Sequence, residues 1–369
     1  MTIHVVCLDG TNQTRTQPCP TNIAHLFNSV GGAAADAGNG SFESTIGDPA
    51  NVTAKYLPGV GAIGSPALRA LGNLFGDGIA EPIIRGYTYL SRSWQTDDEV
   101  IICGFSRGAA AARALAGFVV AQGLLNPSRY DPSDKESAYR RAIAAWYVYR
   151  DGKPDLANQA RLEFIEKLAG TIPTLAPADF SPAITIAAVG VFDTVSSLGI
   201  PHIDFTGQTV FDFSICDTEL SPRVARGFHA LAADEVREVF SPTYWAERDG
   251  VDQQIFAGNH SDVGGGYPQR GLSDCALDWM LDRLNSVAPV FDRAHVPGGC
   301  NPSPLEIAHD DSRVFPFTAR LAHSRSIPNI AIVSATLRSR VGEAVETLPG
   351  TARADYAPRG KYADGTRLV

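Results

Sequence analysis

The sequence has few charged residues and no hydrophobic run that approaches the roughly 20 residues of a membrane span. Asp, Glu, Lys and Arg make up 19% of the 369 residues, whereas 44% are hydrophobic. This composition excludes a disordered chain and is sufficient for a large buried core. The first residues lack the basic and apolar regions of a signal peptide. We therefore expect a cytoplasmic protein, with secretion by a signal-independent route left open.

Basic residues are outnumbered by acidic ones, 31 to 40, which gives a formal net charge of −9. A protein that binds nucleic acid neutralises phosphates with a basic surface, and no basic stripe stands out here. We therefore expect no nucleic-acid partner.

Cysteine is scarce, with six residues and no C-x-x-C pair. Cys7 and Cys103 lie within apolar runs, as small buried residues do. The pattern favours reduced, buried thiols over a disulfide framework or a zinc site.

One serine stands between a predicted strand and a predicted helix. The apolar run Val100–Phe105 leads into Gly104-Phe105-Ser106-Arg107-Gly108, and an alanine-rich helical stretch continues to about Gln122. This is the G-x-S-x-G pattern in the strand–turn–helix context that exposes a nucleophilic hydroxyl at a sheet edge. Without that context it would be an ordinary glycine-flanked serine in a loop.

Strands and helices alternate along the chain, which predicts the α/β fold class with a mostly parallel sheet flanked by helices. The other predicted strands are Ile3–Leu8, Val52–Leu57, Ile184–Phe192 and Gln253–Ala257. In α/β-hydrolases the nucleophile follows the fifth strand. Because only two predicted strands precede the strand that leads into Ser106, we equate Ile3–Leu8 with the third strand of that plan. We expect one α/β-hydrolase-like domain over residues 1–369.

Two regions depart from this alternation. Residues 127–182 read as a helical insertion with helices at about Ser133–Arg150 and Pro154–Ala169. It would be either a lid over an apolar substrate or a packed hairpin, and aromatic residues at helical spacing favour the hairpin. Residues 288–369 read as an irregular C-terminal extension. Ser221-Pro222 predicts the start of a further helix.

A serine hydroxyl becomes a useful nucleophile when a histidine takes its proton and a carboxylate orients that histidine. Ser106, Asp193 and His260 occur in the chain order that α/β-hydrolases use. Asp193 and His260 each follow a predicted strand, so a parallel sheet would bring both to the edge that carries Ser106.

Alternatives to both partners remain open at this point. Asp204 and Asp262 compete with Asp193 for the role of the acid. Asp262 is too close to His260 along the chain to orient its ring easily, but it would pair coherently with His323. For any single histidine or aspartate, a structural role is the more common outcome.

The turn after the first strand is the second candidate part of the site. The loop Asp9-Gly10-Thr11 falls where such enzymes place an oxyanion donor. We expect the N–H of Arg107 and one from Gly10 or Thr11 to form the oxyanion hole, with Asp9 and Asp262 as supporting carboxylates. The alternative is a plain turn with a capping aspartate. This scheme requires no metal and no cofactor, although a metal near the carboxylates is left open.

Several motifs occur together in one order. They are Asp9-Gly10-Thr11-Asn12, Thr21-Asn22, Pro58-Gly59-Val60-Gly61, Gly104–Ala109, Gly190–Val195 and His260–Tyr267. From about Ile3 to Arg283 the chain resembles the α/β-hydrolase family that includes the phospholipase effectors of type VI secretion. The resemblance implies Ser106 as nucleophile, Asp193 as acid and His260 as base. It also implies an ester or lipid substrate and peripheral contact with a membrane; the oligomeric state stays open.

Three other functions compete with this interpretation. Leu8-Asp9-Gly10-Thr11 is similar to the D-x-D-G-T motif of haloacid-dehalogenase-like phosphatases, but Cys7 stands where their nucleophilic aspartate belongs. A non-catalytic binding protein would not need all three triad residue types. A hydrolase of a small intracellular ester or thioester fits the same residues as a lipase.

Overall fold

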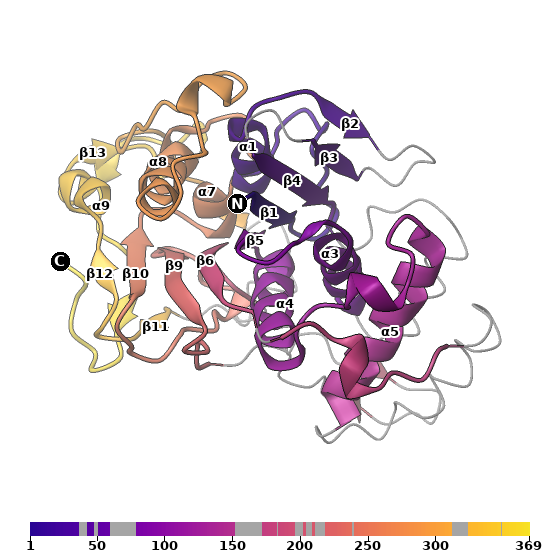
Figure 1. Cartoon of the computed structure of the whole chain (residues 1–369). Coiled ribbons are helices and arrows are strands. Elements are labelled where there is room, and N and C mark those ends of the chain that lie inside the picture. The colour runs from indigo at the N-terminus through magenta and orange to yellow at the C-terminus, as the bar shows by residue number, and fades with distance from the viewer. Residues whose placement is uncertain are drawn as a thin grey trace.

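A nine-stranded sheet forms the centre of the computed structural model, with helices on both faces (Figure 1). The structure describes residues 1–36, 43–47, 51–59, 79–151, 172–182, 184–195, 202–203, 209–210, 218–237, 240–311, 324–347 and 349–369. The strand order is β12-β10-β9-β6-β5-β1-β4-β3-β2. The strands are β1 (Ile3–Leu8), β2 (Ala34–Asp36), β3 (Ser44–Ile46), β4 (Val52–Leu57), β5 (Glu99–Phe105), β6 (Ile186–Phe192), β9 (Val224–Ala232), β10 (Val251–Phe256) and β12 (Ile332–Val333).

All pairings from β4 to β12 are parallel, and only β2 and β3 run antiparallel at one edge. The predicted α/β fold with a mostly parallel, hydrolase-like sheet is therefore confirmed. Parallel pairing places the carboxyl ends of β1, β5, β6, β9 and β10 at one edge. The loops that follow these strands consequently meet there.

The central strands are apolar on both sides because both faces of the sheet are covered. In β5, Val100 and Ile102 pack into the core on one face, while Ile101, Cys103 and Phe105 pack into the core on the other. Successive side chains of a strand point to opposite faces, so one continuous apolar run contributes to two cores.

In the part of the chain that the structure describes, helices cover both faces of the sheet. On one face lie α3 (Ala80–Ser93), α4 (Arg107–Gln122) and α5 (Lys135–Asp151), and on the other α1 (Asn22–Ser29), α7 (His260–Gly264) and α8 (Gly271–Asn285) (Figure 1). The Thr21 hydroxyl caps the start of α1, where it accepts the Ala24 N–H at 3.3 Å. Gly123 follows the last residue of α4, as predicted.

The prediction of a helix after Ser221-Pro222 is wrong, because β9 occupies Val224–Ala232. In the described part of the chain four strands, not two, precede β5, because the sequence does not predict β2 and β3. Both errors have one cause. In β9 the run of apolar residues is interrupted at Arg226 and Gly227, and β2 and β3 have three residues each, so none shows a clear apolar alternation.

Within residues 127–182, α5 is a packed helix. Trp146 is 6% exposed, and its ring lies 5.3 Å from that of Phe118 in α4. Tyr149 lies 5.1 Å from the same ring. The second expected helix, Pro154–Ala169, lies outside the described residues.

The residues after 288 form short elements around the end of the sheet. Their β12 pairs in parallel with β10 and is an edge strand of the main sheet. Nearby, β11 (Ser326–Ile327) pairs with β15 (Lys361–Tyr362), and β13 (Ala344–Val345) pairs with β14 (Ala354–Asp355). The helix α9 (Ala335–Arg340) contacts β10.

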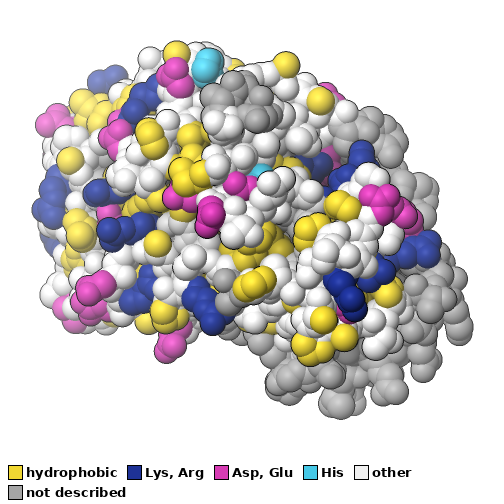
Figure 2. Space-filling model, in the orientation of Figure 1, with side chains coloured by type: hydrophobic (Ala, Val, Ile, Leu, Met, Phe, Trp, Pro, Cys, Tyr) yellow, Lys and Arg dark blue, Asp and Glu magenta, His cyan; other side chains and the backbone are white. Residues whose placement is uncertain are grey.

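The face shown in Figure 2 mixes acidic, basic and hydrophobic side chains. Among the described residues, the large hydrophobic side chains that are exposed come from separate elements: Met1, Val148, Leu305, Ile332 and Val369. No helix in the described part of the chain combines the length and apolar character that crossing a bilayer requires.

Candidate functional site

Ser106 stands between β5 and α4 in a backbone conformation that residues other than glycine rarely adopt. Its φ is 58° and its ψ is −125°. The Ser106 N–H donates to Phe192 O at 3.1 Å, and its carbonyl accepts the Ala109 N–H at 3.1 Å. A conformation of this kind costs of the order of 1–3 kcal/mol and persists only where neighbouring contacts hold it. It is the strained strand-to-helix turn that the G-x-S-x-G pattern predicts.

The glycines of the pattern allow α4 to approach the sheet. A Cβ on Gly104 would lie 2.3 Å from Gly108 O, and a Cβ on Gly108 would lie 2.3 Å from Leu8 O. Both contacts would be with backbone atoms, which cannot rotate away. Larger residues at either position would therefore separate the serine from the turn that follows β1.

Asp193 and His260, 67 residues apart, form a buried hydrogen-bonded pair. His260 Nδ1 lies 2.6 Å from Asp193 Oδ2, and the two residues are 4% and 0% exposed. Asp193 follows β6 with a φ of 39°, so it too has a conformation rare for a residue with a side chain. Such conformations cluster at functional sites.

The Asp193 carboxylate is held from two further directions. The Ala232 N–H donates to its Oδ1 at 3.0 Å, and Arg325 donates to Oδ1 at 2.5 Å and to Oδ2 at 2.8 Å. Burial alone would raise the pKa of Asp193. The Arg325 guanidinium and the His260 hydrogen bond outweigh burial and hold this pKa well below its usual range. Asp193 is consequently a carboxylate at neutral pH.

The His260 ring lies between two phenylalanine rings. Its centroid is 4.6 Å from that of Phe105, the neighbour of Ser106, and 4.7 Å from that of Phe240. Because the ionised Asp193 accepts from Nδ1, the neutral ring carries its proton there and presents a lone pair at Nε2. Nε2 is buried and makes no hydrogen bond to any described residue, Ser106 included.

The Asp9 side chain organises the turn after β1. Its carboxylate accepts the Gly10 N–H at 2.7 Å, the Thr21 hydroxyl at 2.8 Å and the Tyr56 hydroxyl at 2.5 Å. Arg107 Nε donates to the Thr11 hydroxyl. The turn is therefore bonded to the first residue of α4, next to Ser106.

Glycines again set the distances around this turn. A Cβ on Gly10 would lie 2.9 Å from the Phe105 ring and 3.4 Å from Ser106 Cβ. A Cβ on Gly59 would lie 1.5 Å from Gly10 O. This explains why the Pro58-Gly59 motif accompanies Asp9-Gly10-Thr11, since Gly59 packs directly on the back of the turn.

We expect Asp9 to make stability depend on pH. Burial raises its pKa to about 6, against the hydrogen bonds from Tyr56, Thr21 and Gly10 that lower it. Between about pH 4 and pH 6 the folded protein therefore binds more protons at Asp9 than the unfolded chain does. The contribution of Asp9 to the free energy of unfolding is therefore largest at low pH, and it falls by about 3 kcal/mol as the pH rises through that range.

Denaturant unfolding of the wild type and Asp9→Asn from pH 4 to pH 7 measures this effect. The free energy of unfolding of the wild type minus that of the variant should decrease across pH 4–6 and then level off. A difference that stays constant with pH would show that Asp9 titrates normally.

A second histidine–aspartate pair includes Asp262, which is two residues from His260 along the chain. His309 Nδ1 lies 2.7 Å from Asp262 Oδ1, and the His309 N–H donates to Asp262 Oδ2 at 2.9 Å. The His309 ring stacks on Tyr267 with centroids 3.8 Å apart. Asp262 thus has a histidine partner other than His260, while the alternatives Asp204 and His323 lie outside the described residues.

Two charged residues near His260 were not singled out from the sequence. Glu235 Oε2 accepts the His260 N–H at 3.3 Å, and Arg325 holds Asp193. Glu235 follows β9, so recognising the apolar run at the end of that strand would have pointed to it. No local pattern marks Arg325, which is 132 residues from Asp193.

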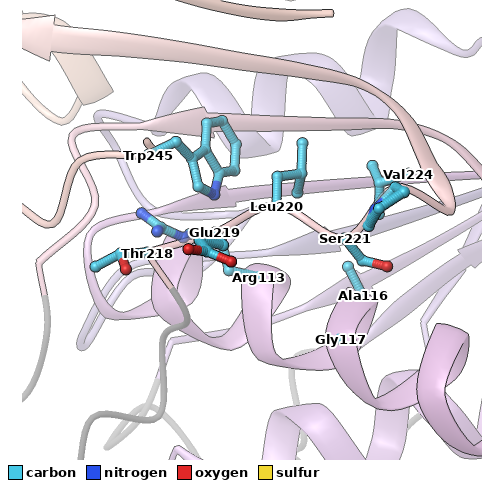
Figure 3. A pocket seen from close by; sticks show the side chains of 10 residues that line it. Arg113, Ala116, Gly117, Thr218, Glu219, Leu220, Ser221, Val224 and Trp245 are labelled. Carbon is cyan, nitrogen blue, oxygen red and sulfur yellow. The ribbon is translucent and has the colours of Figure 1, made fainter. Parts of the chain in front are cut away.

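A separate cavity of about 380 Å³ lies beside the middle of α4 (Figure 3). It is lined by Arg113, Ala116 and Gly117, by the segment 218–224 that enters β9, and by Trp245. The Arg113 guanidinium lies 4.8 Å from the Trp245 ring centroid. The lining segment 218–224 precedes the amino end of β9, whereas Ser106, Asp193 and His260 follow the carboxyl ends of β5, β6 and β10, so this cavity is not part of the site above.

Comparison with known proteins identifies the family. Residues 3–283 match the model of the T6SS phospholipase effector Tle1-like catalytic domain. An uncharacterised protein of Saccharomyces cerevisiae, YEL023C, is 25% identical over 209 residues, which are 53% of this chain and 27% of the yeast protein.

Two solved structures are similar at lower identity. An uncharacterised protein from Pseudomonas aeruginosa is 18% identical over 82% of this chain and 49% of its own, with a TM-score of 0.41. The Tle1 effector bound to the VgrG spike of the type 6 secretion system is 20% identical over 73% of this chain and 52% of its own, with a TM-score of 0.39. The chain thus spans about a quarter of the yeast protein and about half of each solved chain. Since the family model covers well over half of its length, the chain belongs to the family of Tle1-like phospholipase effectors, in the part that forms their catalytic domain.

Proposed function

We propose that this protein is a serine hydrolase that cleaves a carboxylic ester of a phospholipid through an acyl-enzyme. The observation that supports this most is the buried hydrogen bond of 2.6 Å between His260 and Asp193 beside the strained turn at Ser106. An ionised acid, an oriented imidazole and an elbow serine from three loops are the parts that this chemistry needs.

In the proposed reaction, Ser106 Oγ attacks the ester carbonyl carbon while His260 Nε2 accepts the hydroxyl proton. His260 then donates that proton to the leaving alcohol oxygen, and the acyl group stays on Ser106. A water molecule attacks the acyl-enzyme by the same path in reverse, which releases the fatty acid and restores the serine. The hydrogen bond between His260 and Ser106 has to close when substrate binds, as in many triad enzymes whose free form has a longer contact.

For the oxyanion we assign two backbone donors. One is the N–H of Arg107 at the start of α4, where the helix dipole also favours negative charge. The other is the N–H of Thr11. The Gly10 N–H donates to Asp9 at 2.7 Å, so we give Gly10 a steric role, as the residue without a Cβ against Phe105 and Ser106.

The substrate class rests on the family. Its members are described as phospholipase effectors of type VI secretion, which favours a membrane phospholipid over a small cytoplasmic ester or thioester. It also favours secretion by a signal-independent route over the cytoplasmic location expected from the sequence. Asp9 supports the Gly10–Thr11 turn in this scheme, while Asp262 holds His309.

Turnover of a substrate panel tests the substrate class. Phosphatidylglycerol and phosphatidylethanolamine vesicles, a p-nitrophenyl butyrate solution and an acyl-coenzyme A thioester are compared by free-acid release. We expect kcat/KM on the vesicles to exceed that on either soluble substrate by at least about tenfold, since a lipase binds the rest of the substrate as well as its ester. Faster turnover of the thioester or the short ester would replace the phospholipase proposal with the small-substrate one.

A further inference from the structure

The part of the chain beyond the family match contributes a side chain to the triad acid. The matched region ends at residue 283, and Arg325 lies beyond it, immediately before β11. Arg325 is 7% exposed. Its two terminal nitrogens contact the two oxygens of Asp193 at 2.5 Å and 2.8 Å, in the bidentate geometry that guanidinium and carboxylate groups favour.

The same guanidinium also bonds the surroundings of His260. Nη1 donates to Ala232 O at 3.0 Å, at the end of β9, and Nη2 donates to Phe240 O at 2.8 Å. Phe240 is one of the two rings that contact His260. One side chain therefore links the acid, the strand whose Ala232 N–H bonds that acid, and a residue that packs on the base.

We propose that Arg325 is a positioning residue of the catalytic site, which fixes the orientation of Asp193 and neutralises part of the negative charge that Asp193 presents to His260. This inference rests on the proposed function, because it assigns a part to Arg325 in the same reaction. If Arg325 has this role, the part of the chain after residue 283 contributes a side chain that the site needs.

The charge has a consequence with a definite sign. An uncompensated Asp193 would stabilise the protonated imidazolium of His260 and so keep the base occupied by a proton to higher pH. The Arg325 cation opposes this interaction. Removing the cation should move the acidic limb of the rate profile to higher pH.

Other charged groups also face His260, and they keep their own partners when Arg325 is substituted. Glu235 bonds the His260 N–H and is paired with Arg237 at 2.6 Å, and Asp262, two residues away, is paired with His309. The neighbouring His229 is held neutral by burial, which lowers its pKa to about 3. A shift on removing Arg325 is therefore attributable to Arg325.

The test compares Arg325→Met with the wild type by the rate of Ser106 labelling with a fluorophosphonate probe between pH 5 and pH 9. This rate requires the base but not a particular lipid. We expect the acidic limb to move upward by about one pH unit and the plateau rate to fall. An unmoved limb would overturn the proposal.

Two further variants separate charge from structure. Arg325→Lys keeps the positive charge but loses the bidentate guanidinium geometry, so the acidic limb of its pH–rate profile should not move. We expect its kcat on p-nitrophenyl butyrate to fall at least about fivefold, with little change in KM. Arg340→Met is the matched control, since Arg340 is 0% exposed, donates to Pro304 O and Glu306 O, and lies over Tyr356. It should lower Tm without moving the limb.

The outcomes distinguish this inference from the proposed function. If Ser106→Ala still labels or still hydrolyses the ester, the proposed function fails, whatever Arg325 does. If Ser106 is required but the acidic limb lies at the same pH in Arg325→Met and Arg340→Met, only the inference about Arg325 fails. Should Arg325→Met not fold, Arg325→Lys decides: unchanged kcat would overturn the proposal, and a loss of kcat at unchanged KM and limb position would support it.

Discussion

Replacing Ser106 with alanine is expected to lower ester hydrolysis by a factor on the order of 10⁴ to 10⁶, to the level that oxyanion donors and binding supply alone. The acyl group has no other acceptor in the proposed reaction, so loss of Oγ removes the chemical step rather than substrate binding. Stability should change little, because alanine meets the same strain at a φ of 58° that serine does.

Initial rates on phospholipid vesicles and p-nitrophenyl butyrate measure this effect, with fluorophosphonate labelling as an independent readout. Ser339→Ala is a suitable control, since this exposed hydroxyl on α9 donates to Thr336 O of its own helix. If Ser106→Ala retains a tenth or more of the wild-type rate, the acyl-enzyme mechanism is wrong.

The second large effect separates the two histidine–aspartate pairs. His260→Ala is expected to lower kcat/KM by about 10³- to 10⁵-fold, because Ser106 then has no base. His309→Ala should keep activity within about tenfold, since its partner Asp262 joins loop 308–311 to α7 rather than orienting a base. Removal of the His309 side chain should instead lower Tm, because the buried Asp262 carboxylate then loses its partner.

The two hydrogen bonds are nearly equal, at 2.6 Å and 2.7 Å, so distance does not choose between the pairs. The surroundings of the two pairs distinguish them. His260 contacts the ring of Phe105, next to Ser106, whereas His309 stacks on Tyr267. Loss of activity in His309→Ala with full activity in His260→Ala would transfer the role of the base to His309.

The positions of Ser106, Asp193 and His260 at one sheet edge were predictable because each follows an apolar strand. β5, β6 and β10 were all recognised in the sequence, and parallel strands place the residues that follow them at the same edge. The sequence leaves the acid open between Asp193, Asp204 and Asp262, because it predicts a helix start where β9 lies. The carboxylates one strand later are Asp234 and Glu235, and neither was considered.

The partner of Asp262 shows where spacing fails. His323, the alternative partner of Asp262, lies outside the described residues, and among those described His309 bonds Asp262. Any histidine in an irregular region could have been the partner, since no period relates such a residue to a loop of the sheet. Glu235 is missed for a different reason, because the sequence does not predict β9, the strand that it follows.

The sequence by itself determined the α/β class, the strained serine turn and the family, because local apolar periodicity and closely spaced glycines act over a few residues. Only the tertiary structure decided which carboxylate meets which histidine, and that Arg325 holds Asp193 from beyond the matched region. Those pairings join residues as far as 132 positions apart. They depend on how the C-terminal elements fold back over the sheet edge, which no local pattern of side chains encodes.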